Sequence, residues 1–535
     1  MTPRRRALGT TWEIRSIAIR EPKPKGPWIA THEHVRSSRW TDRALFVCAV
    51  FVTRYLCRSH FLYDIDSVNY ALALDHFNPQ AHQPHPPGYY LYVCLGRLIY
   101  GFTHDANGAL VGLSIAAECG AVVAIYLLAE DWFGRKAALF AGALFVVSPL
   151  AWFHGTVALV YAIEVFFSAW VGYICWRIYR GETALVLQSG ILLGVAVGFR
   201  PSSILLLGPL WLISVWKSGP RRTGAGVAAL GLASLAWFVP MLFESGGAAA
   251  YFGSIASLWQ QVPGRQSVLQ NGIIFTLARL CVVTVMYGSC FGAGLIALLV
   301  GACPAASDKP KRLFTMVWVF PGLLFFSLVF FAYVNSGYLL ALSPPVFAWL
   351  GVRAAAWHSA PRFGKRTKTL IIGLFAGGNV AFFLAAPVYF SYRAVRGFEA
   401  SLVAIRTDLP RLFSAEDTLI VGFDSHFLGY RHAGYYLPDF FTMQYPEVSL
   451  EGGPQVFAVE HRNTIVLREL SLGRFKKFVF FPLPEGAAYR SYVDKVRLRF
   501  PKPPEAVRSG GREYITGGAA DLAVLFPTVV RPNSP

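Results

Sequence analysis

Charged residues are scarce in this sequence. Asp, Glu, Lys and Arg together make up 15% of the 535 residues, whereas hydrophobic residues make up 54%. Soluble domains carry more charge and lack repeated long apolar segments. This chain instead contains many apolar runs that approach the roughly 20 residues a helix needs to span a bilayer. The composition therefore predicts a polytopic membrane protein and argues against a soluble globular domain.

Several motifs are also missing. All eight cysteines lie in the apolar part of the chain, none lies in the C-terminal segment, and no CxxC pair occurs. Neither a disulfide framework nor a structural zinc site is therefore expected. The sequence contains no Walker loop, no GxGxxG in a βαβ setting, no GxSxG and no HExxH. These absences argue against nucleotide-driven transport within the chain.

Basic residues are distributed unevenly between the apolar runs. The formal net charge of +19 could indicate nucleic-acid binding, but the basic residues cluster in alternate loops, such as 135–136, 217–222 and 353–368. The intervening loops hold few, chiefly Arg200 and Arg265. This is the positive-inside pattern. It predicts a cytoplasmic N-terminus, an extracytoplasmic C-terminus and no nucleic-acid partner.

Hydropathy divides the chain into three parts. Residues 1–40 form a basic tail, expected to be cytoplasmic because no signal-peptide cleavage site is evident. Residues 41–390 form an α-helical transmembrane domain of about eleven helices in the inner (plasma) membrane. Residues 391–535 lack a spanning run, and β-rich pieces alternate there with helical stretches, which predicts a small extracytoplasmic α/β domain. The runs expected to span lie near residues 43–58, 107–129, 137–153, 157–177, 185–199, 202–216, 224–243, 271–302, 313–333, 337–356 and 368–390.

The first outer loop, residues 59–106, holds a carboxylate pair at the start of a predicted helix. Asp64 and Asp66 lie two residues apart. A carboxylate just outside the bilayer can act as a general base on a hydroxyl, with its pKa raised by burial or by the neighbouring carboxylate. Alternatively, Asp66 or Ser67 caps the helix SVNYALALDHF, and both roles can hold at once. A dense set of ionisable groups at the mouth of a membrane bundle favours a function.

The same loop contains two histidines in a proline-rich turn. The segment HQPHPPGY cannot be helical through Pro87, so the prolines hold His82 and His85 in place. Either ring could bind a phosphate as the imidazolium or a divalent metal as the neutral imidazole. The alternative is a helix-entry turn whose histidines touch lipid headgroups. The sequence identifies no metal ligand set, and no cofactor is certain.

Two further charges lie within or beside apolar runs. Glu164 lies in VALVYAIEVFFSAW, about two turns from the outer end of its run, with Tyr161 one turn before it. A carboxylate in a span predicts a cavity or a cationic partner, and a structural hydrogen bond is the alternative. Arg200 precedes Pro201 on the side that holds few cations, which suits bidentate binding of a lipid phosphate. Snorkelling to headgroups is the alternative.

The C-terminal part offers one weaker signal. Asp424 and His426 follow the predicted strand TLIVGF directly. Loops at the carboxyl ends of strands often bind ligands in α/β folds. The favoured interpretation is nevertheless that these residues cap the following helix, FLGYRHAGYYL.

These motifs resemble those of GT-C-fold integral-membrane glycosyltransferases. The similar group is protein O-mannosyltransferase-like, uses polyprenyl-phosphate-linked sugars and includes the bacterial aminoarabinose lipid A transferases. The resemblance rests on DSVNYA at 66–71, on HPPGYY at 85–90, on the span ending in an Arg-containing turn (LLAEDWFGRK), and on the span that contains Glu164. It covers about residues 60–200.

The resemblance implies a membrane glycosyltransferase with a polyprenyl-phosphate-sugar donor and a glycan, lipid or protein acceptor. Asp66 would be the catalytic base, with Asp64 beside it, and His85 would lie near the donor phosphate. Arg200 on that phosphate is inferred from its position, and Glu164, Tyr161 and His82 are expected in the substrate cavity. A transporter or flippase of lipid-linked sugars is the alternative, and it predicts paired broken helices.

Overall fold

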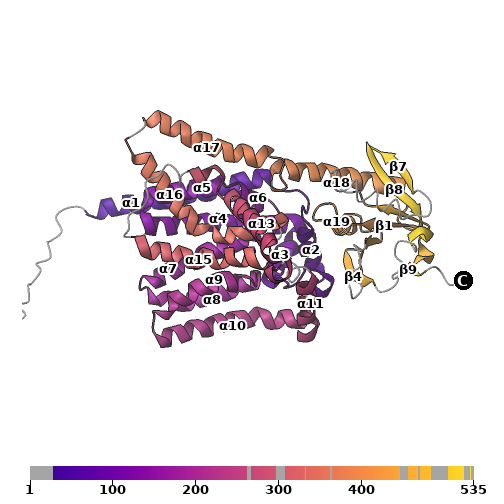
Figure 1. Ribbon diagram of the computed structural model, residues 1–535, viewed down its shortest axis with the longest axis horizontal. Helices are drawn as coiled ribbons and strands as arrows, with labels where there is room; N and C mark the ends of the chain where they lie inside the picture. The colour runs from indigo at the N-terminus through magenta and orange to yellow at the C-terminus, as the bar shows by residue number, and fades with distance from the viewer. Residues whose placement is uncertain are drawn as a thin grey trace, which may run out of the picture.

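The computed structural model describes residues 28–261, 267–296, 308–331, 333–361, 364–445, 456–467, 470–482, 504–522 and 530–531. These residues form a bundle of roughly parallel and antiparallel helices with a β-sheet domain beyond one end (Figure 1). Most of the predicted basic tail, residues 1–27, lies outside the described residues, as does Arg265.

The bundle helices follow the predicted apolar runs. Their bounds are α1 (Trp28–Cys57), α4 (Ala106–Phe133), α5 (Arg135–Val146), α6 (Pro149–His154), α7 (Tyr161–Tyr179), α8 (Val186–Phe199), α9 (Ser203–Trp216), α10 (Pro220–Glu244), α11 (Ala248–Gln261), α13 (Val268–Ser289), α15 (Lys309–Leu328), α16 (Pro344–Ser359) and α17 (Lys365–Ala385). The 3₁₀ segment η5 (Tyr333–Leu342) precedes α16. The predicted outer loop contains α2 (Ile65–Asp75), η1 (Pro79–Ala81) and α3 (Tyr90–Thr103).

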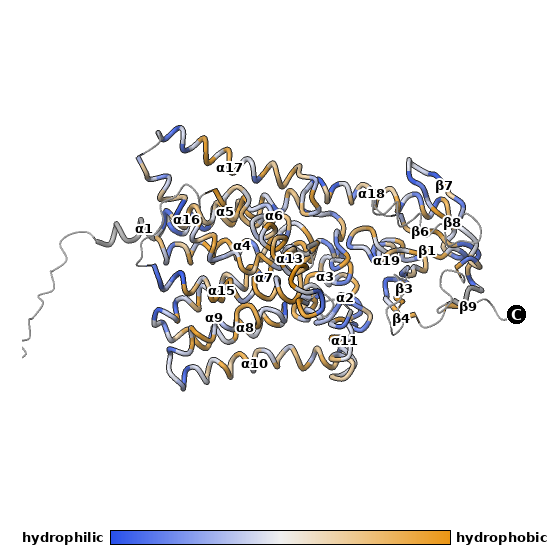
Figure 2. Tube along the Cα trace, viewed as in Figure 1, coloured by the Kyte–Doolittle hydropathy of each residue, from blue (hydrophilic) through white to orange (hydrophobic). Residues whose placement is uncertain are grey.

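The protein is a multi-pass membrane protein. Among the described residues, α4, α10, α13, α15 and α17 are long and apolar enough to cross a bilayer, and a bent pair, Ser336–Leu342 with α16 at 66°, would make a sixth crossing. Hydrophobic residues line the bundle helices, whereas hydrophilic residues gather at their turns (Figure 2). Length and apolarity thus support five or six of the roughly eleven predicted spans. One predicted span, at 137–153, is divided because α5 ends at Val146 and Pro149 starts α6.

Small residues let neighbouring helices approach closely. On α8, a side-chain Cβ at Gly190 would come within 2.3 Å of the backbone oxygen of Gly226 on α10. At Gly194 it would come within 2.7 Å of the Ala233 side chain. Only glycine fits such contacts, because it has no Cβ. Close backbone packing of this kind joins helices in a bilayer, where lipid supplies no hydrophobic driving force between them.

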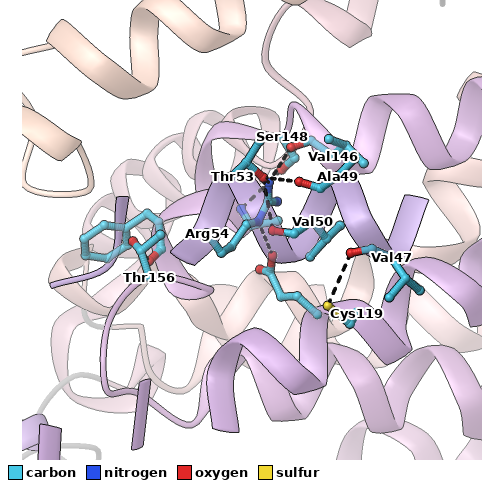
Figure 3. Close-up of polar contacts among 12 residues, drawn as sticks. Val47, Ala49, Val50, Thr53, Arg54, Cys119, Val146, Ser148 and Thr156 are labelled. Carbon is cyan, nitrogen blue, oxygen red and sulfur yellow. Dashed lines mark hydrogen bonds and ion pairs between the residues drawn. The ribbon is translucent and has the colours of Figure 1, made fainter. Parts of the chain in front are cut away.

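A fully buried ion pair joins the first helix to the bundle (Figure 3). Arg54 on α1 donates from Nε to Oε2 of Glu118 on α4 at 2.7 Å, and from Nη1 to the carbonyl of Val146 at 2.7 Å. The guanidinium also lies 5.1 Å from the ring centre of Trp152. Neutralisation within the bundle explains how Arg54 is tolerated there.

The same region anchors the start of the outer loop. Ser148 caps α6 by accepting a hydrogen bond from the N–H of Ala151 at 3.2 Å. After α6, the carbonyl of Thr156 accepts from the N–H of Ser59 at 2.8 Å. Figure 3 shows Ser148 and Thr156 around the buried arginine. The segment that enters the outer loop is therefore fixed by α1 and α6 together.

The C-terminal domain is built on a mixed sheet. Helix α17 is followed by α18 (Tyr392–Leu412), and the two run along one edge of the molecule into this domain (Figure 1). The sheet order is β4-β3-β2-β1-β6-β8-β7, with β1 parallel to β2 and β6 and the other pairs antiparallel. The strand bounds are β1 (Thr418–Gly422), β2 (Thr442–Gln444), β3 (Val456–Glu460), β4 (Asn463–Leu467), β6 (Lys477–Phe480), β7 (Glu505–Ser509) and β8 (Arg512–Gly518), and β5 (Leu470–Ser471) pairs with β9 (Val530–Arg531). The predicted strand TLIVGF corresponds to β1, and the β-rich pieces NTIVLREL and KKFVFF contain β4 and β6.

Buried hydrogen bonds join the sheet domain to the outer loop. The short helix α19 (Tyr430–Tyr436) packs between α2 and strands β1–β3. Arg431 donates to the carbonyl of Ala81 and to Oγ1 of Thr464, each at 3.1 Å. The N–H of Thr464 in turn donates to Oε1 of the fully buried Gln83. Because these groups are shielded from water, the loop and the domain form one packed unit.

We predict that Arg431→Met lowers the free energy of unfolding by about 2 kcal/mol, since it leaves buried acceptors without a donor while keeping the apolar stem. Thermal unfolding in detergent measures the loss. Arg474→Met is the matched control because Arg474 pairs with Glu460 at the surface, and exposed pairs contribute only about 0.5 kcal/mol. Equal losses in the two variants would contradict the anchoring role of Arg431.

Candidate active site

A cavity of about 490 Å³ lies where the bundle meets the sheet domain. Its lining includes residues of α2 and α11, which lie at one end of the bundle (Figure 1). The polar lining comes from the outer loop, the residues at and after the end of α8, η5, the loop after β1 and the start of α19. The polar residues that line it are Asp66, Asn69, His82, His85, Tyr89, Arg200, Ser202, Tyr338, Asp424, His426 and Arg431.

The other wall of the cavity is apolar. It is formed by α11, through Ile255, Leu258 and Trp259, and by the end of α15 and the residues after it. Those residues are Phe325, Phe326 and Phe330. A cavity with one charged wall and one aromatic and aliphatic wall suits an amphiphilic molecule, whose polar and apolar parts it can receive separately.

Asp66 lies in the first turn of α2 and faces the cavity. Its Oδ1 lies 3.2 Å from Nδ1 of His85, an ion-pair distance, although the ring N–H is not aligned with the oxygen. Asn69 donates to the same oxygen at 3.4 Å. Burial alone would raise the pKa of Asp66, but His85 and the hydrogen bonds lower it to about 2. The expected upward shift is therefore wrong, because the neighbouring imidazole outweighs burial.

Asp64 has a different position. Its carboxylate accepts a hydrogen bond from the N–H of Asp66 at 2.9 Å and caps α2, so the cap is Asp64 and not Asp66 or Ser67. The side chain is buried and does not line the cavity. Its Oδ2 lies 3.4 Å from Nδ1 of His426. Asp64 thus orients the start of α2 and contacts the sheet domain rather than the cavity.

The Asp64 carboxyl and the His426 imidazole both have raised pKa values. Burial raises the pKa of Asp64, and the imidazole of His426 opposes that rise only in part. Burial would lower the pKa of His426, but the Asp64 carboxylate outweighs it and raises the value to about 9. The His426 ring is accordingly cationic at neutral pH. Its backbone carbonyl also accepts from the N–H of Ile65 at 2.8 Å.

The two histidines of the proline-rich turn differ. His85 lies between Asp66 and Tyr89, with Nε2 3.0 Å from the Tyr89 hydroxyl. His82 adopts a left-handed backbone conformation, with φ 56°, and its ring contacts Phe457 at 5.1 Å between centres. Burial lowers the pKa of His82 to about 3, so its ring is neutral in the protein without a ligand. Phosphate binding by His82 or His85 stays a prediction.

Glu164, Tyr161 and Arg200 come together, although 36 residues separate Glu164 from Arg200. Glu164 lies in the first turn of α7, and Arg200 ends α8. The guanidinium Nη1 donates to Oε2 of Glu164 at 2.5 Å. The ring centres of Tyr161 and Tyr338 lie 4.7 and 4.5 Å from the guanidinium carbon. Arg200 is thus buried at the cavity, where it pairs with Glu164 and stacks on two tyrosine rings. Its side chain does not extend toward lipid headgroups.

The sheet domain supplies cavity residues for which the sequence favoured a different role. Asp424 and His426 line the cavity, whereas α19 starts at Tyr430 with Gly429 at its N-cap, so the preferred capping role is wrong. The sequence signal for their place in the cavity was their position directly after β1, because loops at the carboxyl ends of parallel strands often bind ligands. Burial raises the pKa of Asp424. Tyr338 and Arg431 were missed, because no motif marks an aromatic or basic residue that is brought in by distant segments.

No metal centre is evident in the described ranges. No group of three or more His, Cys, Asp or Glu side chains there is arranged to hold a metal ion. The donor set around Asp66 consists of one carboxylate and one imidazole, both engaged with each other. The metal prediction for His82 and His85 therefore gains no support from the arrangement.

Comparison with known proteins identifies the class of fold. No family model matches the sequence, and no curated protein matches it. In structure, however, the chain shares the fold of a solved membrane protein, and its helices form a multi-span bundle with a C-terminal sheet region. The expected helical membrane bundle with a C-terminal sheet domain is confirmed at the level of the fold.

The solved structures that are similar to this chain include two of ArnT and one of an archaeal oligosaccharyltransferase. ArnT from Cupriavidus metallidurans, in a crystal structure bound to undecaprenyl phosphate, is similar with a TM-score of 0.55 and 14% identity over 90% of this chain and 98% of that chain. Its apo structure gives a TM-score of 0.50 and 13% identity over 93% and 100% of the two chains. The apo oligosaccharyltransferase of Archaeoglobus fulgidus is less similar, with a TM-score of 0.43 and 12% identity over 75% and 64%.

We predict that the Asp64–His426 contact stabilises the fold in a pH-dependent manner. The folded-state pKa of His426, about 9, lies above its ordinary value of 6.5. The contribution is therefore complete below pH 6.5 and is lost as the pH rises through about 9. Because the ring is partly exposed, we expect a difference of about 1 kcal/mol between wild type and His426→Gln.

Thermal unfolding at pH 6 and at pH 9.5 measures this difference. The stability gap between wild type and His426→Gln should shrink at the higher pH. His104→Asn is the control, because His104 is exposed at the end of α3 and Asn tolerates its left-handed backbone. A gap that stays constant with pH would rule out the charged contact.

Proposed function

We propose that the protein is a membrane glycosyltransferase. It would move a sugar from a polyprenyl-phosphate-linked donor to a hydroxyl of a glycan, lipid or protein acceptor on the extracytoplasmic side. The supporting observation is the amphiphilic cavity at the end of a membrane bundle, which has an ionised Asp66 and a buried Arg200 on one wall and aromatic side chains on the other.

The donor suits the two walls of the cavity. A prenyl chain stays in the bilayer, and Trp259, Phe325 and Phe330 can contact it at the membrane end. Loss of the phosphate builds negative charge, which the fixed guanidinium of Arg200 can stabilise without reorganising. The crystal structure of ArnT with undecaprenyl phosphate bound shows that this fold accommodates such a lipid. We extend that chemistry to this chain as part of the proposal.

Asp66 is the proposed base. An acceptor oxygen would attack the anomeric carbon, the bond from that carbon to the phosphate oxygen would break, and the acceptor proton would pass to Asp66. A carboxylate whose pKa is about 2 is a weak base. A donor phosphate that binds beside Asp66 adds negative charge there, which favours the neutral carboxyl and raises the pKa of Asp66 toward its ordinary value. Donor binding would thus activate the base.

A transporter or flippase of lipid-linked sugars is the alternative. It predicts broken helices in corresponding positions of two repeats. In the part of the chain that the structure describes, one bent span is found, formed by Ser336–Leu342 and α16. This bend favours the enzyme, because it brings the Tyr338 ring to 4.5 Å from the Arg200 guanidinium at the cavity.

Asp66→Asn should keep the fold and lower sugar transfer at least about 100-fold, the usual contribution of a positioned base. Purified protein in nanodiscs would receive a panel of radiolabelled polyprenyl-phosphate sugars with candidate acceptors. Asp75→Asn is the matched control, because Asp75 ends the same helix and is exposed. Transfer at the wild-type rate by Asp66→Asn would contradict the assignment of Asp66 as the base. If wild type binds the lipid but transfers no sugar, the transporter is favoured.

Arg200 should govern donor affinity. The double variant Glu164→Gln/Arg200→Gln removes the pair without leaving one buried charge alone, and it should bind undecaprenyl phosphate about 10–100-fold more weakly, as expected for lost charged hydrogen bonds. The control is Arg97→Gln/Glu244→Gln, which removes a 2.6 Å pair outside the cavity lining. Binding is measured by native mass spectrometry with lipid titration. Equal affinities in both double variants would refute the phosphate role of Arg200.

A further inference from the structure

Tyr89 has a backbone conformation that side chains rarely adopt. It lies directly before α3 with φ 47° and ψ 43°, and it follows Gly88 at φ 103°. Residues other than glycine occupy this left-handed region only where the surroundings hold them there, and such residues concentrate at functional sites. The conformation is therefore a reason to ask what the Tyr89 side chain does.

Contacts from α11 and α2 hold the residue in place. The hydroxyl of Tyr251 on α11 donates to the carbonyl of Pro87 at 3.0 Å, which fixes the turn. The Tyr70 ring on α2 meets the Tyr89 ring edge to face, with 5.3 Å between centres. Only 6% of Tyr89 is exposed, yet it lines the cavity. The strained backbone thus places the tyrosine between α2 and the cavity.

A chain of polar contacts ends at the Tyr89 hydroxyl. His85 lies 3.2 Å from Asp66 through Nδ1 and 3.0 Å from the Tyr89 oxygen through Nε2. With its proton on Nε2, the His85 ring donates to the tyrosine oxygen and occupies one of its lone pairs. The tyrosine proton must then point to another acceptor. Tyr89 and Arg200 line the same cavity, where an anionic acceptor would lie.

We propose that Tyr89 is a further catalytic residue, which donates a hydrogen bond to the phosphate oxygen that leaves the sugar. This inference rests on the proposed glycosyl transfer. In the step, the carbon–oxygen bond breaks with its electron pair on the phosphate oxygen, and the acceptor proton goes to Asp66. Tyr89 keeps its own proton, and His85 keeps Tyr89 oriented as a donor.

The hydrogen bond would act mainly in the transition state. The bridging oxygen of the donor carries little charge before the bond breaks and gains charge as it breaks. A donor fixed at that oxygen stabilises the transition state more than the bound substrate. Removal of the hydroxyl should therefore lower kcat more than it raises KM.

Tyr89→Phe tests this role because it removes only the hydroxyl and keeps the ring that packs on Tyr70. The matched control is Tyr92→Phe, three residues further along the chain, in α3. The Tyr92 hydroxyl is buried and has no hydrogen-bond partner among the described residues. Both variants would be compared with wild type for thermal stability and for binding of undecaprenyl phosphate, so that a folding defect is recognised.

Transfer would be measured with a polyprenyl-phosphate sugar and with its phosphorothioate analogue, whose leaving group has nearly the same shape but is less basic. We expect Tyr89→Phe to lower kcat about 100-fold with the phosphate donor, the usual cost of one such hydrogen-bond donor. Its KM should change by less than about threefold. With the less basic leaving group the loss should fall below about tenfold. Tyr92→Phe should match wild type.

The outcomes separate the two proposals. Wild-type kcat in Tyr89→Phe would overturn the catalytic role of Tyr89 and leave the transferase intact. A loss of equal size with both donors would also overturn it, because it would mean that Tyr89 only positions His85. Absence of transfer by wild type with every donor would refute the proposed function and the role of Tyr89 with it.

Discussion

The structure depends on the pairing of buried and half-buried charges at the end of the membrane bundle that meets the sheet domain. An isolated charge there would cost several kcal/mol, and in practice such a group is neutralised or paired. Arg200 is paired with Glu164, and Asp66 with His85. Deeper in the bundle, Arg54 is paired with Glu118. The first two pairs face or support the cavity, whereas the third holds the helices that lead to it.

The sheet domain completes the cavity as well as covering it. His426 contacts Asp64 and lines the cavity, and Asp424 and Arg431 line it from the same domain. Gln83 and Thr464 join the two parts through a buried hydrogen bond. Because the polar wall draws on both parts, a change in the docking of the domain would alter the electrostatics around Asp66. Such coupling gives the domain a direct physical effect on the chemistry proposed.

The division of the cavity into two walls follows from where it lies. Membrane helices can present aromatic side chains to a hydrocarbon chain, while irregular backbone is tolerated only where it is buried in protein or lines a cavity. The proline-rich turn and the bend before α16 are such irregular segments, and both reach the cavity. They bring His85 and Tyr338 to the cavity where a lipid phosphate would lie.

The sequence by itself determined the membrane class, the positions of the helices and the outer loop as the source of Asp66 and His85, because hydropathy and proline chemistry act locally. It also indicated β1, because a short run of apolar, strand-forming residues can be recognised without knowing which strands pair with it. Only the tertiary structure decided that Asp64 caps α2, that His426 reaches it, and that Arg200 meets Glu164 and not headgroups. The direction of the Asp66 pKa shift likewise depends on a neighbour 19 residues away (66 to 85). Charges and rings interact through space, and the fold alone sets those distances.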